Sequence, residues 1–274
     1  MEKNTTEKPN KFGSYFFGDF ENNEKELIRL KKQASIGLKI EQEIWKKIDV
    51  KEQGNILDIG CGPGVISGAL ADFYKHSHVT GIDKNELLIQ DALNGIQKEH
   101  ENLTFKTGDI HELNEGAFDF IYSRFLFQHL KNPLDAIKNL YNNLNDDGKV
   151  CIVDVDDAWL SLMPKSNDFE AYIAKSQEYQ AKYGGDRFVG SKLHQHFIDA
   201  GFKEVHTEVK MVSTEHIRID HFLDMIINYK FLLFKDAEAA EKEELNALRE
   251  NILNYTNIRN SWGAIGIFFV TATK

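Results

Sequence analysis

Short apolar runs alternate with amphipathic stretches along the chain as far as residue 160. Each run has the length of a buried strand, and the stretches between them carry apolar residues at a period near 3.6, as a helix with one buried face does. This alternation is typical of an α/β protein. Strands are predicted at 55–59, 79–83, 103–107, 118–123 and 149–155, and helices at 24–48, 65–73, 87–92 and 132–144.

The alternation changes after residue 160, where helices become more frequent than strands. The pattern predicts helices at 169–183, 192–200, 216–234 and 237–255, with strands at 205–212 and 264–273. The last two helices are inserted between two strands that would otherwise form a hairpin. We expect them to fold over a binding site as a lid. Most of their large side chains should be core, and one or two should reach a substrate: Phe222, Met225, Tyr229, Phe231 or Phe234.

A glycine-rich turn follows the first predicted strand. Asp58 lies near the end of that strand, and Gly60, Gly62 and Gly64 follow at every second position. Backbone N–H groups in such a turn can approach a ligand, and the helix that begins at residue 65 presents a partial positive charge there. A dinucleotide fingerprint would place its third glycine at position 65, which is Val65 in this chain.

An acidic residue also ends the second predicted strand. Asp83 is followed by Lys84, and a carboxylate at this strand tip can accept hydrogen bonds from both hydroxyls of a ribose. The alternative is that Asp83 caps the next helix. Both roles are compatible with one side chain.

The turn from Asp58 to Gly64 resembles the first motif of the class I S-adenosylmethionine-dependent methyltransferases. The resemblance implies a doubly wound α/β fold with a seven-stranded, mostly parallel sheet, a last antiparallel strand and a helical lid. It also implies S-adenosyl-L-methionine as cofactor and methyl transfer to an O, N or C atom of a small-molecule acceptor. Three regions follow: an N-terminal segment and helix covering the cofactor site (1–50), a Rossmann-like cofactor core (51–160), and the remaining sheet with its lid at about 167–200 and 216–258 (161–274).

The same resemblance implies which residues contact the cofactor. In the family, an Asp at the position of Asp109 accepts from the adenine amine and the next residue packs on the ring; a Gly-Asp turn is the alternative here. The run from Tyr15 to Gly18, followed by Arg29, Leu30 and Gln33, resembles the lead-in that closes over the methionine end of the cofactor. The predicted cofactor-binding residues are Tyr15, Gln33, Asp58, Gly60, Cys61, Gly62, Gly64, Asp83, Lys84, Gly108, Asp109, Ile110, Ser123 and Arg124.

The segment after the fourth predicted strand resembles the loop that lines the methyl-transfer site. Arg124 could hold the methionine carboxylate, or pair with a surface acid without contacting the ligand. His129 is the candidate catalytic residue, since histidine can act as a base near neutral pH; the alternative is a helix residue with a satisfied ring. Arg187 could face the acceptor or form a structural ion pair.

Three carboxylates cluster where the fifth predicted strand ends. Asp154, Asp156 and Asp157 lie close to Trp159, but no histidine or further ligand spacing accompanies them, so we expect no metal. A carboxylate and an aromatic side chain at the mouth of the cavity would suit a cationic or amine-bearing acceptor.

Charge and composition narrow the class of partner. The formal net charge of −10 argues against nucleic acid, and the apolar runs are shorter than a membrane helix requires. Residues 1–11 lack the apolar core of a signal peptide. Cys61 and Cys151 do not suggest a disulfide framework, which fits a reducing cytoplasm. We expect a monomer or a homodimer.

Two other functions remain open from the sequence. A catalytically silent S-adenosylmethionine-binding regulator would carry the same cofactor motifs. An NAD-dependent oxidoreductase would also use a glycine turn and Asp83, but this chain lacks the third glycine of its fingerprint.

Overall fold

A computed structural model describes residues 23–274 of the chain. Tyr15 and the rest of the run 15–18, which we predicted to close over the methionine end of the cofactor, lie outside the described residues. The contact predicted for Tyr15 therefore stays a prediction.

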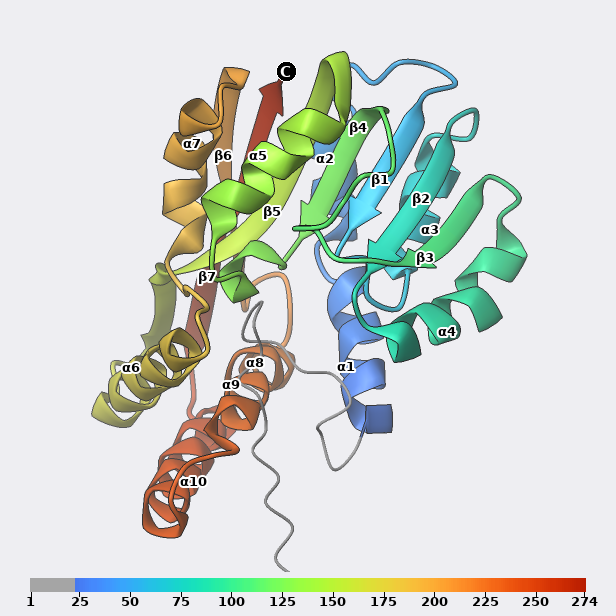
Figure 1. Cartoon of the computed structure of the whole chain (residues 1–274). Helices are drawn as coiled ribbons and strands as arrows, with labels where there is room; N and C mark the ends of the chain where they lie inside the picture. Colours follow the sequence, from blue (N-terminus) through green and yellow to red (C-terminus); the bar gives the residue numbers. More distant parts are fainter. Residues whose placement is uncertain (1–22) are drawn as a thin grey trace, which may run out of the picture.

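A seven-stranded sheet forms the centre of the molecule (Figure 1), in the order β3-β2-β1-β4-β5-β7-β6. Strands β1 to β5 pair in parallel, and β7 is antiparallel to both of its neighbours, β5 and β6. This is the predicted doubly wound sheet with an antiparallel last strand. The strands are β1 (Asn55–Ile59), β2 (His78–Asp83), β3 (Leu103–Thr107), β4 (Phe118–Arg124), β5 (Leu144–Met163), β6 (Lys203–Ser213) and β7 (Trp262–Thr273).

Helices cover both faces of the sheet, and each face has its own apolar core. Because successive strand residues point to opposite faces, Ile56 packs with the helices on one side and Leu57 with those on the other. The first face is covered by α2 (Leu38–Trp45), α3 (Val65–Phe73) and α4 (Glu86–Asn94), and the second by α5 (Pro133–Asn143) and α7 (Val189–Asp199).

The strand order reverses between β1 and β4. The chain leaves β1 toward β2 on one side, while β4 pairs with β1 on the other. Such a switch point leaves a crevice beyond the carboxyl ends of the strands, which is where open α/β sheets bind ligands. Figure 1 shows these strand ends pointing toward α1 (Asn23–Ser35) and the C-terminal helices.

The single helix predicted at 24–48 is two helices. Gly37 has a φ of 88°, in the left-handed region that glycine adopts without steric cost, and it separates α1 from α2. The prediction of one continuous helix was therefore wrong. The break turns α2 so that Ile44 and Trp45 pack into the core beside β1 and β4.

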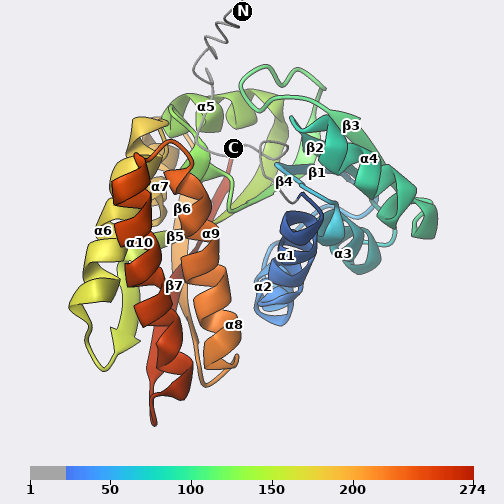
Figure 2. The ribbon, with the colours of Figure 1, turned by 90° about the horizontal axis from the view of Figure 1, so that it is seen from below.

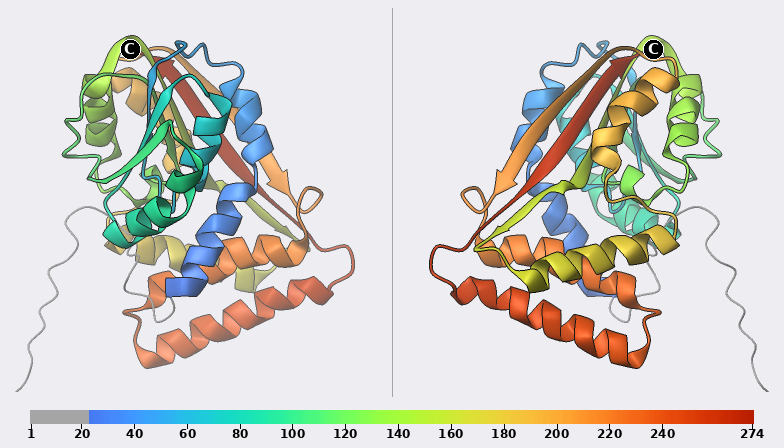
Figure 3. Two further views of the ribbon diagram at one scale, coloured as in Figure 1. Left: turned by 90° about the vertical axis from the view of Figure 1, so that its right-hand side faces the viewer. Right: turned by 90° about the vertical axis from the view of Figure 1, so that its left-hand side faces the viewer.

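The lid helices lie together at one end of the sheet. Residues 219–234 form α8 (Ile219–Leu223), a π-helical turn (Asp224–Asn228), α9 (Tyr229–Phe231) and a 3₁₀ turn (Leu232–Phe234). Figures 2 and 3 show this segment beside α6 (Asn167–Lys182) and α10 (Ala239–Leu253), which pack against each other. In contrast, α7 packs on β5, β6 and β7, so residues 192–200 cover the sheet and not the crevice.

The remaining elements are short 3₁₀ turns at Ile96–Glu99, Phe127–His129 and Asn254–Asn257. Within residues 23–274, none of the helices is long and apolar enough to cross a membrane.

Candidate cofactor and substrate site

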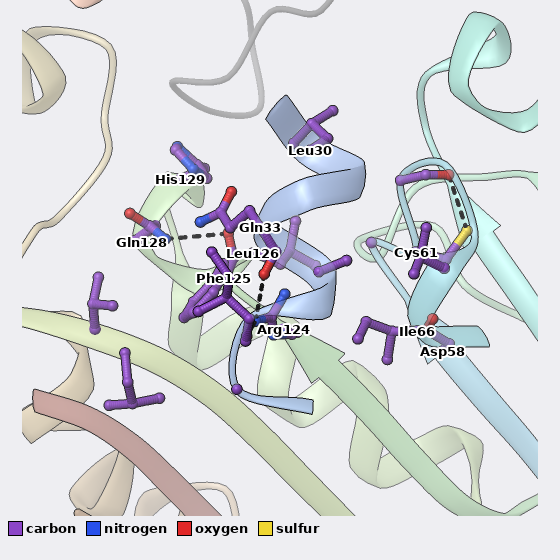
Figure 4. Close-up of a pocket in the computed structure, with 18 of the residues that line it drawn as sticks. Leu30, Gln33, Asp58, Cys61, Ile66, Arg124, Phe125, Leu126, Gln128 and His129 are labelled. Atoms are coloured by element: carbon purple, nitrogen blue, oxygen red, sulfur yellow. Dashed lines mark hydrogen bonds between the residues drawn. The ribbon is translucent and has the colours of Figure 1, made fainter. Parts of the chain in front are cut away.

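A cavity of about 230 Å³ lies at the carboxyl ends of the central strands. Figure 4 shows Asp58 and Cys61 on one side of it and Gln128 and His129 on the other, with Gln33 and Arg124 between them. Most of the predicted site residues line this cavity: Gln33, Asp58, Gly60, Cys61, Gly62, Asp83, Lys84, Gly108, Asp109, Ile110, Arg124 and His129.

The wall divides into two parts that we name by the chain segments that build it. The cofactor half comprises the lining residues between 23 and 126, and the acceptor half those between 127 and 269. The charged residues of the cofactor half are Arg29, Glu41, Asp58, Asp83, Lys84, Asp109 and Arg124, and those of the acceptor half are Arg187, Lys210 and Lys230.

The glycine turn opens its backbone toward the cavity at Gly62. A Cβ atom added there would meet nothing within 4 Å, whereas one on Gly60 would lie 2.9 Å from Leu126 Cδ2. Gly64 has a different role, because its Cβ would lie 2.5 Å from the Phe105 ring and the residue does not line the cavity. The N–H of Gly60 donates to the carbonyl oxygen of Ile82 at 2.7 Å, which ties the turn to β2.

Asp83 is held by two backbone N–H groups. Its Oδ2 accepts from Gly62 N at 2.9 Å and its Oδ1 from Asn85 N at 2.8 Å. Each carboxylate oxygen can accept a further hydrogen bond, so both remain able to bind hydroxyl groups. Burial raises the pKa of Asp83 above its usual value. The cap of α4 is Asn85, whose side chain accepts from Leu87 N and Leu88 N, so the alternative role of Asp83 as that cap was wrong.

Asp58 is fully buried behind the glycine turn. Its Oδ2 accepts from the Ser67 hydroxyl at 2.6 Å. Burial raises the pKa of this carboxyl to about 7, and the Ser67 hydrogen bond opposes the rise. Ser67 lies on α3 nine residues after Asp58, and sequence reasoning did not identify it.

The tips of β2 and β3 are joined beside the cavity. Gly108 N donates to the carbonyl oxygen of Asp83 at 3.0 Å, and Asp109 Oδ1 accepts from His111 N at 2.9 Å. The Gly-Asp turn considered above is therefore present, and it presents Asp109 and the buried Ile110 to the cavity.

Arg124 is bonded within the wall of the cavity. Its Nε lies 2.8 Å from Glu41 Oε1. Its Nη2 donates to the carbonyl oxygens of Gln33 and Ile36 at 3.1 and 3.0 Å, and Figure 4 shows the bond to Gln33. Glu41 is 2% exposed and also accepts from the Tyr122 hydroxyl, so the partner of Arg124 is a buried acid and not the surface acid we considered. This pair joins α1, α2 and β4.

Ser123 is fully buried and does not line the cavity. Its hydroxyl donates to the carbonyl oxygen of Ile59 at 2.9 Å. The residue therefore links β4 to β1 at the switch point, and we correct its predicted contact with the cofactor to a structural role.

His129 lies where the two halves meet. Its Nε2 is 3.1 Å from the Tyr229 hydroxyl of the lid, and the two rings form an edge-to-face pair. Burial, followed by the cation of Arg187, holds the pKa of His129 well below its usual value. The imidazole is therefore neutral at pH 7, and it can exchange a hydrogen bond with Tyr229.

The three carboxylates lie in the middle of β5, which continues past its predicted end to Met163, and they point to different partners. Asp154 accepts from the N–H groups of Gln128 and Val155, and Asp156 from those of Ala158 and Ser191. Among residues 23–274 there is no group of three or more His, Cys, Asp or Glu side chains that could hold a metal.

Asp157 forms a buried cluster with two cations. Arg187 donates to both of its oxygens, at 2.6 and 3.2 Å, and Lys230 Nζ donates at 2.8 Å. Trp159 is half-exposed, packs against Phe268 and does not line the cavity. The predicted attraction of a cationic acceptor by this aspartate and tryptophan was therefore wrong, because the carboxylate is already neutralised.

A family model described as a methyltransferase domain matches residues 50–217, which include the glycine turn and the tips of β1 to β4. The chain belongs to this methyltransferase family. The predicted family, fold, enzyme class and cofactor are thereby confirmed, and the NAD-dependent oxidoreductase is not supported.

Individual relatives agree with this assignment. The chain is 32% identical over 176 residues to a ubiquinone biosynthesis O-methyltransferase of Coxiella burnetii. The match covers 57% of this chain and 72% of that protein. An uncharacterized methyltransferase of Schizosaccharomyces pombe is 26% identical over 162 residues, and the match spans 56% of this chain and 58% of that one.

A solved structure shares the fold of this methyltransferase. Phosphoethanolamine N-methyltransferase 2 of Haemonchus contortus, in complex with S-adenosyl-L-methionine, superimposes with a TM-score of 0.60 at 18% identity. The match covers 94% of this chain and 59% of that one.

The cofactor half fits S-adenosyl-L-methionine chemically. Gly62 leaves open space where any other residue would place a Cβ, and the Asp83 carboxylate retains acceptor capacity on both oxygens for ribose hydroxyls. Asp109 offers a fixed acceptor for an exocyclic amine. The charged residues of this half, four carboxylates and three cations, suit a ligand that carries both signs of charge.

Proposed function

We propose that this methyltransferase moves the methyl group of S-adenosyl-L-methionine to an O, N or C atom of a small-molecule acceptor. The observation that carries the proposal is the convergence of Gly62, Asp83 and Asp109, from the tips of three neighbouring strands, on one cavity. The acceptor half continues this cavity toward the lid, where Met225 and Tyr229 line it.

The residues of the cofactor half would bind and orient S-adenosyl-L-methionine. Asp83 would accept from the ribose hydroxyls, Asp109 from the adenine amine, and the backbone of Gly62 allows close approach. Bound S-adenosyl-L-methionine supplies a methyl group that its sulfonium already activates. The protein can therefore contribute mainly by alignment, an effect that can reach roughly 7–11 kcal/mol in well-oriented systems.

A base is required only for an acceptor that arrives protonated. His129 lines the cavity and is the candidate base, but its lowered pKa makes it a weak base at neutral pH. The pair with Tyr229 suits His129 better to positioning a hydroxyl or amine of the acceptor. Its predicted catalytic role remains a proposal.

Calorimetry and product analysis test this function separately. We expect micromolar or tighter binding of S-adenosylhomocysteine and no binding of NAD; binding of NAD alone would refute the assignment. Incubation of S-adenosyl-L-methionine with the protein and a panel of phenols, amines and carboxylic acids should yield S-adenosylhomocysteine. If the protein binds the cofactor but yields no product with any member of the panel, the silent regulator replaces the enzyme.

We also propose that the protein works in a reducing cytoplasm as a monomer or homodimer without nucleic acid. Its two cysteines, Cys61 and Cys151, are both buried and unbridged, and the net charge of −10 disfavours a phosphate backbone. Light scattering on the eluting protein should give the mass of one or two chains; a larger assembly would contradict the proposal.

A further inference from the structure

The acceptor half contains more buried positive charge than its neighbours neutralise. Arg187 and Lys230 are 5% and 1% exposed, and both line the cavity. Asp157 is the acid that contacts them, and among the described residues no acidic side chain lines this half of the wall. Two cations on one carboxylate leave a formal excess of one positive charge.

Asp157 already accepts four hydrogen bonds, as many as a carboxylate has lone-pair sites. Its Oδ1 accepts from Arg187, and its Oδ2 accepts from Arg187, Lys230 and the Gln177 amide. The other guanidinium nitrogen of Arg187 donates to Gln128 Oε1. The Lys230 ammonium has three N–H donors, and Asp157 accepts one of them.

Asp154 is another buried acid in this region, but its hydrogen bonds are not to Arg187 or Lys230. Its carboxylate accepts from the backbone N–H groups of Gln128 and Val155. Burial raises its pKa to about 7, so it is partly neutral at physiological pH. An uncompensated buried cation is costly to a folded protein, which makes an anion from outside the chain the fitting partner.

Lys210, the third cation of this half, pairs with Glu208. Apart from the polar side chains of Gln128, His129 and Tyr229, the rest of the acceptor half is apolar. Val155 and Val212 contribute to it from β5 and β6, Ile226 from the lid, and Ile265, Ile267 and Phe269 from β7. A ligand that fills this half therefore needs an apolar body as well as a negative charge. An excess of one charge matches a monoanion.

We propose that the methyl acceptor is a carboxylic acid with an apolar body, whose carboxylate pairs with Lys230 and Arg187. The proposal rests on the function proposed above and names its substrate class. Arg187 bonds Gln128, the neighbour of His129 in the chain, and Lys230 is the neighbour of Tyr229. The carboxylate would thus be held near the His129–Tyr229 pair.

Direct binding to the full chain saturated with S-adenosylhomocysteine tests the proposal without requiring turnover. The probes are naphthalene-2-carboxylate, naphthalene-2-carboxamide and 2-naphthyl phosphate, which share one apolar body. We expect the carboxylate to bind about tenfold or more tightly than the amide, as for a charge-assisted pair in a buried site. A ratio below about threefold, or tighter binding of the phosphate than of the carboxylate, would overturn the proposal.

Lys230→Met removes the excess charge and leaves the Arg187–Asp157 pair balanced. The preference for carboxylate over amide should fall below about threefold, with affinity for S-adenosylhomocysteine within about twofold of the wild type. Lys192→Met is the matched control, because Lys192 forms a comparable pair with Asp186 at 2.6 Å but is exposed and outside the cavity. It should keep the full preference.

Lys230→Arg keeps the charge and should keep most of the preference. A Lys230→Met protein that still binds S-adenosylhomocysteine and discriminates as the wild type does would refute the role of this residue. Loss of S-adenosylhomocysteine binding by the wild-type protein would instead refute the proposed function, so the two failures are distinguishable. If the Lys230 variants do not fold, the ratio of carboxylate to amide affinity in the wild-type protein alone decides whether the proposal stands.

Discussion

The cofactor half and the acceptor half of the cavity are built in different ways. In the cofactor half three carboxylates accept from a partner close in sequence: Asp83 from Asn85, Asp109 from His111 and Asp58 from Ser67, at separations of 2, 2 and 9 residues. The exception is Glu41, whose partner Arg124 is remote in sequence. In the acceptor half the partners are remote. Asp157 meets Arg187 across 30 residues and Lys230 across 73, and His129 meets Tyr229 across 100.

The two halves also differ in charge. Four carboxylates and three cations line the first, whereas three cations and, among the described residues, no carboxylate line the second. A motif that binds a common cofactor can be encoded within one strand and its following turn. The selection of an acceptor depends on side chains that only the folded chain brings together.

The largest expected effect concerns the pair that closes the cofactor half. Arg124→Met leaves Glu41 buried with the Tyr122 hydroxyl as its remaining described partner, and loss of one member of a buried ion pair costs about 3–5 kcal/mol. Urea denaturation should show this loss in the free energy of unfolding. Lys47→Met, which removes an exposed pair with Glu208, should cost less than about 1 kcal/mol. Equal effects would show that Glu41 is not effectively buried.

The next largest expected effect is on the affinity for the cofactor product, which tests the cofactor half alone. Asp83→Ala removes the acceptors for ribose and should weaken S-adenosylhomocysteine binding about tenfold or more, roughly 1.4 kcal/mol. Asp119→Ala is the control, because Asp119 also accepts from a backbone N–H, that of Asn55, and does not line the cavity. Titration calorimetry measures both variants. Unchanged affinity in Asp83→Ala would remove Asp83 from the ribose site.

A smaller effect is the response to pH, which should have opposite signs in the two halves. Asp58, with a pKa of about 7, gains negative charge as the pH rises through neutrality. Affinity for the S-adenosylmethionine cation should therefore increase from about pH 6 to about pH 8.

Over the same range the acceptor half becomes less positive. Asp154 ionises near pH 7, and Lys230, whose pKa burial and Arg187 lower to about 8, begins to lose its proton; Arg187 stays charged and His129 stays neutral. Binding of naphthalene-2-carboxylate should weaken. Parallel calorimetric titrations compare the two ligands, and a change of the same sign for both would contradict the division of charge.

The smallest expected effect is at the junction of the halves. His129→Gln keeps a side chain able to bond the Tyr229 hydroxyl and, because the histidine is neutral, removes no charge. Affinities for S-adenosylhomocysteine and naphthalene-2-carboxylate should change by less than about threefold. Once an acceptor is known, a rate loss in this variant that is full at neutral pH and shrinks at low pH, where the wild-type His129 is protonated, would instead identify His129 as a base.

Much of the cofactor half could be predicted from the amino-acid sequence because its determinants are local. The strand that ends at Ile59, the glycines that follow it and the acid at the tip of β2 occur within about thirty residues, and their spacing alone indicates the turn. The seven-stranded, mostly parallel sheet and its antiparallel last strand followed from the resemblance to the family. The cap Asn85 and the break at Gly37 were also local, and attention to Asn and Gly at helix ends would have identified them.

The acceptor half was decided by tertiary structure. A lysine at position 230, directly before the apolar run 231–234, signals an unusual environment, but nothing in the chain says that Asp157 and Arg187 will meet it. The same holds for Glu41, an acid on the buried face of α2 that meets Arg124. The spacing of residues along the sequence predicts hydrogen bonds between near neighbours, whereas the pairing of remote charges depends on how the lid packs on the sheet. Only the folded chain shows which charges remain uncompensated.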